Sequence, residues 1–499
     1  MQRSLQFVRD ARKPAAYTLH VFNQKTIEKQ KKTITLPEKF CDELIFEKKS
    51  TPFKFASFPE GYGRTSAFLI LTDELSTFTL HETLRKSLPM DTLLKGSALI
   101  NVATISAFES ERVLNAVGNL FALASYSPER FGRGAVERSE RMKKQNGKSI
   151  EIEIRSSGKA ADAEKIFETG YREGSAINLV RKLSDLPGNE LRPEHYLDRV
   201  KTLMKDHKIT STFYDQKALK KLNAGAFLAV VRANPSEPYG ILKLHYKPNK
   251  KPKVSKKKVA IVGKGLCYDT GGYNIKVGES MFGMHRDMTG SAVALALTKH
   301  LIEEESEVEI ETYLALAENL ISPSAYRPND VVTASNGVSI EVVDTDAEGR
   351  MVLADTLVMA SNEKPDLIID FATLTGAILR SIGTARSGIF SNSEKLLAVG
   401  LKAGNETGER VWSFPIGEDY MTGLESEVAD IKQCGPGNFC DHIYAATFLS
   451  QFVENNVPWI HVDLSAESNK GGLGLSGRDV TGFGVRFGKR VIQSFLKRS

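Results

Sequence analysis

Apolar segments alternate with helix-like segments between residues 259 and 371, and this alternation restricts the fold more than any other feature of the sequence. The strand-like segments occupy residues 259–262, 308–316, 340–343 and 367–371, and the helix-like segments occupy about residues 291–304 and 351–361. Apolar strands separated by helices are typical of a parallel or mixed sheet that helices cover on both faces. We therefore expect an α/β fold whose functional groups lie at the carboxyl ends of the strands.

The length of 499 residues predicts two or three domains rather than a single core. The first third also alternates strand-like and helix-like segments, but it has no group of His, Asp or Glu at the spacing of metal ligands. A charged helical segment ends at Pro187-Gly188-Asn189, which is a strong stop signal. We expect a smaller N-terminal α/β domain with an assembly or regulatory role, a linker helix, and a larger catalytic C-terminal α/β domain with a central mixed sheet flanked by helices. Their expected bounds are 1–160, 161–187 and 188–499.

Charged, glycine-rich sequences directly follow two of the expected strands. The first is GKGLCYDTGGYNIK from Gly263, with Lys264, Asp269 and Lys276, and the second is DTDAEGR from Asp344, with Asp346, Glu348 and Arg350. Residues spaced by two share one side of an extended segment, so the last three charges are expected to face one site. The apolar segment 351–360 is expected to form a buried helix that holds these charges at the edge of the core.

The carboxylates of these motifs, together with Asp287 before the helix that Thr289-Gly290 opens, predict a metal site. Asp269, Asp287, Asp346 and Glu348 carry a formal charge of −4, which two divalent cations would balance. A buried carboxylate needs such a partner because an unpaired buried ion is costly. Oxygen-rich ligation suits Mg²⁺, Mn²⁺ or Zn²⁺ at a centre that also binds water.

A different interpretation of the same residues is a buried salt-bridge network in which Lys264, Lys276 and Arg350 pair with the acids. The glycines among the charges favour the metal site, because glycine lets the backbone approach a ligand closely. Nucleotide binding is disfavoured, since neither GxxxxGK[ST] nor GxGxxG is present.

Composition excludes several classes of protein. With 41% hydrophobic and 26% charged residues the chain is globular rather than disordered, and the absence of about 18 consecutive apolar residues argues against a membrane span. The four cysteines form no CxxC pair, which argues against a disulfide framework or a thiolate zinc site, and Cys267 has the apolar neighbours of a packed thiol. We expect a cytoplasmic protein.

The net charge of +6 arises largely from two basic runs, one at Lys29, Lys31 and Lys32 and one at Lys250, Lys251, Lys253, Lys256, Lys257 and Lys258. Such runs are usually solvated, and no aromatic residues accompany them, so nucleic acid is not an expected partner. The alternative function is a DNA-associated or scaffolding role that uses these runs and the N-terminal domain.

Taken together, four segments resemble the M17 leucyl aminopeptidase family. VGKGLCYDTGGYNIK from Val262, RDMTGSA from Arg286, DTDAEGRMVLADTL from Asp344 and DFATLTGA from Asp370 occur in the order of the family. The similarity extends from about Asn178 to Arg486, while the N-terminal third is similar only in size and in its α/β alternation. The resemblance implies a two-metal exopeptidase that removes leucine-like residues from the N-termini of peptides and assembles as a homohexamer.

The resemblance also implies a role for each site residue. One metal would be bound by Lys264, Asp269, Asp287 and Glu348, and the other by Asp269, Asp346 and Glu348, so Asp269 and Glu348 would bridge. The metals would be Zn²⁺ or Mn²⁺, with Mg²⁺ or Co²⁺ as alternatives. Lys264 would have to be neutral, whereas Lys276 would stay charged and stabilise the oxyanion of the tetrahedral intermediate. Arg350 would hold a bicarbonate that acts as general base towards the bridging water.

The pocket for the first side chain of the substrate would be formed by Met284, Thr373, Leu374, Gly376, Ser465 and Ser468. Two serines there predict a pocket more polar than that of a strict leucine enzyme. Asp344 stands where the family commonly has Asn, which adds a negative charge near the metals. A dinuclear site could also hydrolyse phosphoesters, but a lysine ligand and the amide-type motifs argue against that reaction.

Overall fold

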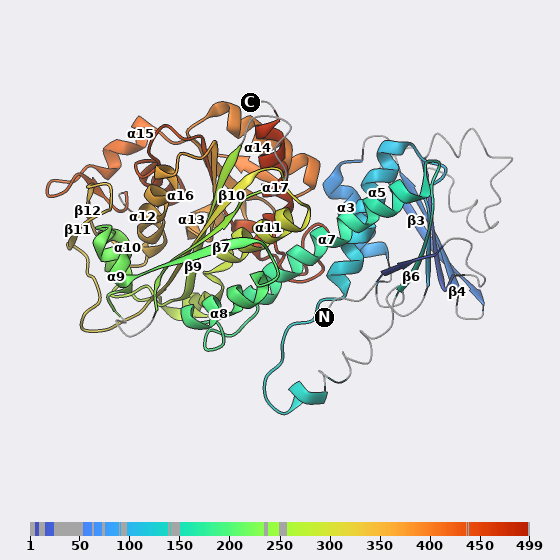
Figure 1. Cartoon of the computed structure of the whole chain (residues 1–499), viewed down its shortest axis with the longest axis horizontal. Coiled ribbons are helices and arrows are strands. Elements are labelled where there is room, and N and C mark those ends of the chain that lie inside the picture. Colours follow the sequence, from blue (N-terminus) through green and yellow to red (C-terminus); the bar gives the residue numbers. More distant parts are fainter. Residues whose placement is uncertain are drawn as a thin grey trace. The chain divides into compact units, whose positions relative to one another are not determined.

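The computed structural model describes residues 5–8, 15–23, 53–61, 64–71, 75–88, 90, 97–137, 140, 150–233, 238–248, 257–435, 437 and 439–497. The chain forms two compact units, Met1–Asn178 with Gly472–Gly477 and Leu179–Gly471 with Arg478–Ser499 (Figure 1). In the described part of the chain, no helix has the length and hydropathy needed to cross a bilayer.

A six-stranded sheet forms the first unit. Its strand order is β1-β6-β5-β2-β4-β3, and all neighbours are parallel except β3 and β4. The strands are β1 (Leu5–Phe7), β2 (Tyr17–Asn23), β3 (Phe53–Gly61), β4 (Arg64–Leu71), β5 (Ala98–Asn101) and β6 (Ile150–Arg155). Its helices are α3 (Thr77–Ser87), α5 (Ala107–Ala124) and the first part of α7 (Ala160–Ser184). Helix α5 begins with a capping box, in which the side chains of Ser106 and Glu109 each accept a hydrogen bond from the backbone N–H of the other residue.

An eight-stranded mixed sheet forms the centre of the second unit, in the order β15-β14-β17-β13-β9-β10-β8-β7. The four middle strands are parallel neighbours, and antiparallel pairs lie outside them. The strands are β7 (Ile209–Asp215), β8 (Gly240–Tyr246), β9 (Lys258–Asp269), β10 (Glu309–Asn319), β13 (Leu367–Ala372), β14 (Ser387–Ser391), β15 (Val411–Ser413) and β17 (Trp459–Asp463). The expected α/β class with a mixed central sheet is confirmed.

The strand order reverses at β9. The chain passes from β9 through α11 (Thr289–Glu303) to β10 on one side, and then through α12 (Glu348–Asn362) to β13 on the other side. Because crossovers between parallel strands are right-handed, this reversal places α11 and α12 on opposite faces of the sheet. The carboxyl ends of β9 and β13 therefore meet at a topological switch point, where α/β proteins bind their ligands.

Strand β9 is longer than the sequence suggested. It continues through Gly263 and Gly265 to Asp269, so the GKGLCYD segment belongs to the sheet and is not a loop. A Cβ atom at Gly263 would lie 2.5 Å from the Cα of Ser291 in α11, which explains why this position has no side chain. The expected strand at 340–343 is also corrected. It shortens to β12 (Ser339–Glu341) and lies in a separate sheet with β11 (Val331–Thr333) and β16 (Ile431–Lys432).

A fully buried ion pair joins β13 to β17. Nδ1 of His461 lies 2.6 Å from Oδ1 of Asp370, and the indole Nε1 of Trp459 donates to Oδ2 of Asp370 at 2.6 Å. Burial lowers the pKa of His461, but the carboxylate of Asp370 outweighs this effect, and the pKa is raised. His461 is thus a buried strand residue.

The variant Asp370→Asn is expected to lower the free energy of unfolding by about 3–5 kcal/mol, because it leaves the buried charge of His461 without its partner. Urea denaturation measures this loss. The control is Asp198→Asn, which removes an exposed ion pair with Lys201 and is expected to change stability by less than about 0.5 kcal/mol. Equal stability of the two variants would contradict the prediction.

Candidate metal centre

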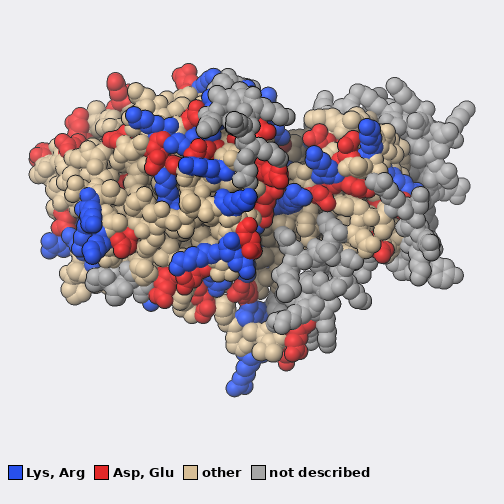
Figure 2. Space-filling model, in the orientation of Figure 1, with Lys and Arg blue, Asp and Glu red and all other residues tan. Residues whose placement is uncertain are grey.

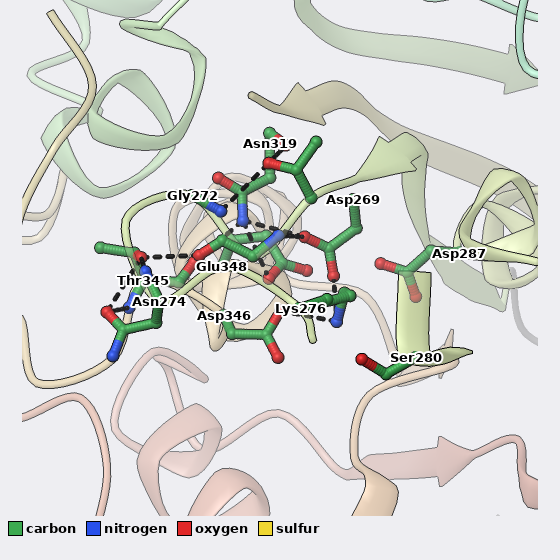
Figure 3. A network of polar contacts seen from close by, with 12 residues as sticks. Asp269, Gly272, Asn274, Lys276, Ser280, Asp287, Asn319, Thr345, Asp346 and Glu348 are labelled. Carbon is green, nitrogen blue, oxygen red and sulfur yellow. Dashed lines mark hydrogen bonds and ion pairs between the residues drawn. The ribbon is translucent and has the colours of Figure 1, made fainter. Parts of the chain in front are cut away.

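Three carboxylates converge at the switch point. Asp269 ends β9, Glu348 begins α12, and Asp346 lies in the loop before that helix (Figure 3). Each offers an oxygen atom, and the three oxygens lie within 4.8 Å of one another. Asp269 and Glu348 are buried, whereas 33% of the Asp346 side chain is exposed. The cluster therefore has one side open to solvent.

Lys264 connects this cluster to Asp287. Its Nζ lies 2.7 Å from Oδ2 of Asp287 and 3.1 Å from Oε1 of Glu348, and it donates to the carbonyl of Thr373 at 3.0 Å. The hydroxyl of Thr373 donates to Oδ1 of Asp287 at 2.9 Å. A Cβ atom at Gly349 would lie 2.6 Å from Nζ of Lys264, so the glycine leaves room for the ammonium at its present position.

Lys276 lies on the other side of the cluster. Its Nζ is 2.8 Å from Oδ2 of Asp269 and 2.6 Å from Oδ1 of Asp346. The chain returns from the end of β9 to Lys276 through Gly271 and Gly272, whose φ angles of 85° and 63° favour glycine. The loop closes when the backbone N–H of Lys276 donates to the carbonyl of Thr270 at 3.0 Å.

The electrostatics of the cluster favour the binding of cations. Burial and neighbouring carboxylates raise the pKa of Asp287 and Glu348, and raise that of Asp346 to about 7. Burial lowers the pKa of Lys264 and Lys276, but the carboxylates outweigh it and raise both values. Four carboxylates and two ammonium groups have a formal charge of −2.

The donor atoms also fit hard divalent cations, because carboxylate oxygens are their preferred ligands. Oδ2 of Asp287 and Oδ1 of Asp346 are buried and accept no hydrogen bond of ordinary geometry from the described residues, although each has a lysine ammonium within ion-pair distance. These oxygens are available to a metal once the lysines move away or lose a proton.

Asn319, at the end of β10, is a site residue that the sequence interpretation missed. Its Nδ2 donates to Oδ1 of Asp269 at 2.9 Å and to the carbonyl of Thr345 at 2.9 Å, and lies 3.4 Å from Oε2 of Glu348. Its position at the carboxyl end of a parallel central strand was the available signal. Asn319 thus contacts the carboxylates of both Asp269 and Glu348 and helps to orient them.

Arg350 does not share the orientation expected from its spacing. The residues from Glu348 onward form α12, so Glu348 and Arg350 are not on one side of an extended segment, and that premise is wrong. The Nη2 of Arg350 donates to both carboxylate oxygens of Asp441, at 2.8 and 2.7 Å, and Nη1 donates to the carbonyl of Gln433 at 3.0 Å. Asp441 and Gln433 were both missed.

The expected pocket residues fall into two groups. Thr373 contacts Lys264 and Asp287, and a Cβ atom at Gly349 would lie 3.0 Å from Cδ1 of Leu374, so Thr373 and Leu374 lie beside the cluster. The others lie on nearby elements: Met284 begins the short helix η2 (Met284–Arg286), Gly376 begins α13 (Gly376–Ile382), and Ser465 begins η4 (Ser465–Glu467), which Ser468 follows. The hydroxyl of Ser465 donates to the carbonyl of Arg386 at 2.6 Å.

The basic runs lie largely outside the described residues, which include only Lys257 and Lys258 of them. Lys257 pairs with Asp366 at 3.3 Å, and Lys258 lies 3.8 Å from Glu363. Figure 2 shows basic and acidic side chains interspersed over the coloured surface of the second unit. The Cys267 thiol is buried and burial raises its pKa, which confirms a packed thiol.

Comparison with known proteins decides the family. Residues 178–487 match the catalytic domain of the cytosol aminopeptidase family, and this segment contains every residue of the cluster. The chain belongs to the M17 cytosol aminopeptidase family. It is 37% identical over 384 residues to the probable cytosol aminopeptidase of Prochlorococcus marinus (strain MIT 9215), covering 76% of this chain and 74% of the relative.

Other relatives extend this result. The probable cytosol aminopeptidase of Gloeothece citriformis (strain PCC 7424) is 40% identical over 314 residues, which cover 62% of each chain. The structure is also similar to that of the bottromycin maturation enzyme BotP in complex with Mn, with a TM-score of 0.80, 25% identity and coverage of 97% of this chain and 100% of the other. The protein is thus a metal-dependent aminopeptidase, and the expected family is confirmed.

Proposed function

We propose that this aminopeptidase hydrolyses leucine-like residues from the N-termini of peptides at a centre of two divalent metals. The observation that carries the proposal is the convergence of Asp269, Asp346 and Glu348, with Asp287 held against the same cluster by Lys264, inside the segment that matches the family. The BotP structure in complex with Mn supports Mn²⁺, and Zn²⁺ suits the same ligands.

In this proposal Lys264, Asp269, Asp287 and Glu348 hold one metal, and Asp269, Asp346 and Glu348 hold the other. Bound metals lower the pKa of water and polarise the carbonyl of the scissile bond. Lys264 would bind as a neutral amine, so metal binding would release its proton. The single positive charge of Lys264 lies between Asp287 and Glu348 and offsets one of their two formal negative charges.

Lys276 has a separate role in the proposal. With metals held by Asp269 and Asp346, the ammonium of Lys276 would no longer pair with these carboxylates and would be available to the substrate. A fixed positive charge beside the scissile carbonyl stabilises the oxyanion that develops there. Lys276 would therefore keep its proton throughout the reaction.

The bicarbonate expected at Arg350 has a competitor in this structure. The guanidinium is already paired with the carboxylate of Asp441, so a bicarbonate would have to displace a side chain of the same charge. Nη2 of Arg350 already donates to both carboxylate oxygens of Asp441, and Nη1 donates to the carbonyl of Gln433.

The proposal extends to the preferred substrate, the oligomeric state and the cellular location. Because the hydroxyl of Ser465 is engaged by the carbonyl of Arg386, the pocket is less polar than two free serines would make it, which favours a leucine-like side chain. We propose that residues 1–160 serve assembly or regulation, that the enzyme forms a homohexamer, and that it acts in the cytoplasm, as the names of its relatives suggest.

Chelation tests the proposed function. We expect hydrolysis of leucine amide to stop after removal of metal and to return with Mn²⁺ or Zn²⁺, because metals polarise the carbonyl and bind the free α-amine. N-acetyl-leucine amide is the matched control, since it lacks that amine and should not react. Turnover that survives chelation, equal turnover of the acetylated compound, or hydrolysis confined to a phosphoester would reject the proposal.

A further inference from the structure

The ion pair between Arg350 and Asp441 is built into the core of the second unit. Arg350 is only 2% exposed, and the side chain of Asp441 is 24% exposed, so the pair has one open side at the carboxylate. Arg350 lies in the first turn of α12, and Asp441 is the first residue of α16 (Asp441–Ser450), which packs on α12. Helix α16 thus presents a carboxylate to a buried guanidinium that α12 carries.

The backbone before Asp441 is held in an unfavourable conformation. Cys440 has φ 46° and ψ 31°, in the left-handed region that residues other than glycine seldom adopt. Such conformations persist where surrounding structure enforces them, and they cluster at functional sites. Here the conformation of Cys440 directs the chain into α16 so that Asp441 reaches Arg350.

Gln433 attaches this pair to the loop that carries the metal-centre carboxylates. Its carbonyl accepts from Nη1 of Arg350, its Oε1 accepts from the backbone N–H of Asp344 at 3.1 Å, and its Nε2 donates to the carbonyl of Ala347 at 3.0 Å. Asp346 lies between Asp344 and Ala347 in the sequence. Gln433 therefore ties the Arg350–Asp441 pair to the loop that carries Asp346.

The guanidinium of Arg350 keeps its proton, as arginine does throughout proteins. A buried charge needs a partner, and a carboxylate and a bicarbonate are equivalent partners, since each is planar, carries one negative charge and offers two oxygens. The Nε–H of Arg350 is also buried and has no acceptor among the described residues. A bicarbonate on Nη2 of Arg350 would take the place of Asp441.

We propose that Asp441 supplies, from within the chain, the carboxylate that the family resemblance assigns to a bicarbonate on Arg350. This inference rests on the proposed function. In hydrolysis the oxygen of water bonds to the carbonyl carbon, one proton leaves that water, and the same proton joins the leaving amine as the C–N bond breaks. Asp441 accepts this proton and passes it on, so turnover needs no dissolved bicarbonate.

The test compares the metal-loaded wild-type enzyme with Asp441→Ala and Asp441→Asn in buffer freed of bicarbonate, with and without added bicarbonate. We expect wild-type kcat to be the same in both buffers. Asp441→Ala should lose about 10²-fold in kcat, the lower end of the usual contribution of a general base. It should regain activity when bicarbonate is added. Asp441→Asn should be equally slow without recovery, because its amide still fills the place beside Arg350.

A second readout avoids activity altogether. Titration calorimetry of the metal-free proteins with bicarbonate should show binding to Asp441→Ala and none to the wild type. Wild-type turnover that depends on bicarbonate would overturn the inference, as would an Asp441→Ala enzyme as fast as the wild type without bicarbonate. The bicarbonate dependence of the wild-type enzyme tests the inference even if the Asp441 variants do not fold. Absence of any metal-dependent turnover in the wild type would instead reject the proposed function.

Discussion

Replacing Glu348 with glutamine is expected to remove metal from the centre and to lower kcat/KM by about 10³-fold or more. The bridging role proposed for Glu348 makes it a ligand of both metals, and its side chain is only 1% exposed. Metals supply several kcal/mol of transition-state stabilisation, and each 1.36 kcal/mol corresponds to tenfold in rate. Glutamine keeps the shape of the side chain, so the loss reports the missing charge.

Metal content per chain, measured beside kcat/KM, makes this prediction specific. Lys264→Ala should lose only about one of two metals, because the lysine is proposed as a ligand of a single ion. Glu309→Gln is the matched control. Glu309 belongs to a different cluster, with His245 and Glu311, in which Lys243 lies 3.1 Å from Glu311. Its replacement leaves the proposed metal ligands unchanged. Full metal content in Glu348→Gln would contradict its proposed role.

The sequence predicted the architecture around the site because hydrophobic periodicity and strand ends carry that information locally. Strands β9, β10 and β13 and helices α11 and α12 fall close to their expected ranges. The extension of β9 could not be foreseen, because the glycines at 263 and 265 look like loop residues. A Cβ atom at Gly263 would meet Ser291 of α11, and one at Gly265 would meet Ala315 and Leu316 of β10. Both contacts depend on the tertiary fold.

The composition of the site was predictable for a related reason. Asp269, Asp346 and Glu348 stood out in the sequence because each follows an apolar segment within a charged, glycine-rich motif, and the three do converge. The expected reason was only partly right, since β12, which precedes Asp346 and Glu348, lies outside the sheet of β9. The partner of Arg350 was not predictable, because Asp441 lies 91 residues away and enters only when α16 packs on α12. The spacing of two also led to the wrong orientation for Arg350, because α12 starts at Glu348 and not at the apolar segment from residue 351.

Replacing Lys276 with methionine is expected to lower kcat by about 10²–10³-fold, the usual effect of losing one group that stabilises an oxyanion. KM should change little, because the charge acts on the transition state more than on the bound substrate. Methionine preserves much of the length and apolar character of lysine. Steady-state kinetics with leucine amide measures both constants.

The same variant is expected to keep its metals, which separates Lys276 from the ligands. The ammonium of Lys276 lies 2.8 Å from Asp269 and 2.6 Å from Asp346, so it competes with a cation for the same oxygens. Removing that positive charge should therefore leave metal affinity unchanged or increase it, while Glu348→Gln lowers it. Lys276→Arg keeps the charge and should retain more of kcat than the methionine variant. A variant that loses metal and kcat together would place Lys276 among the groups that assemble the centre, and not among those that act on the substrate.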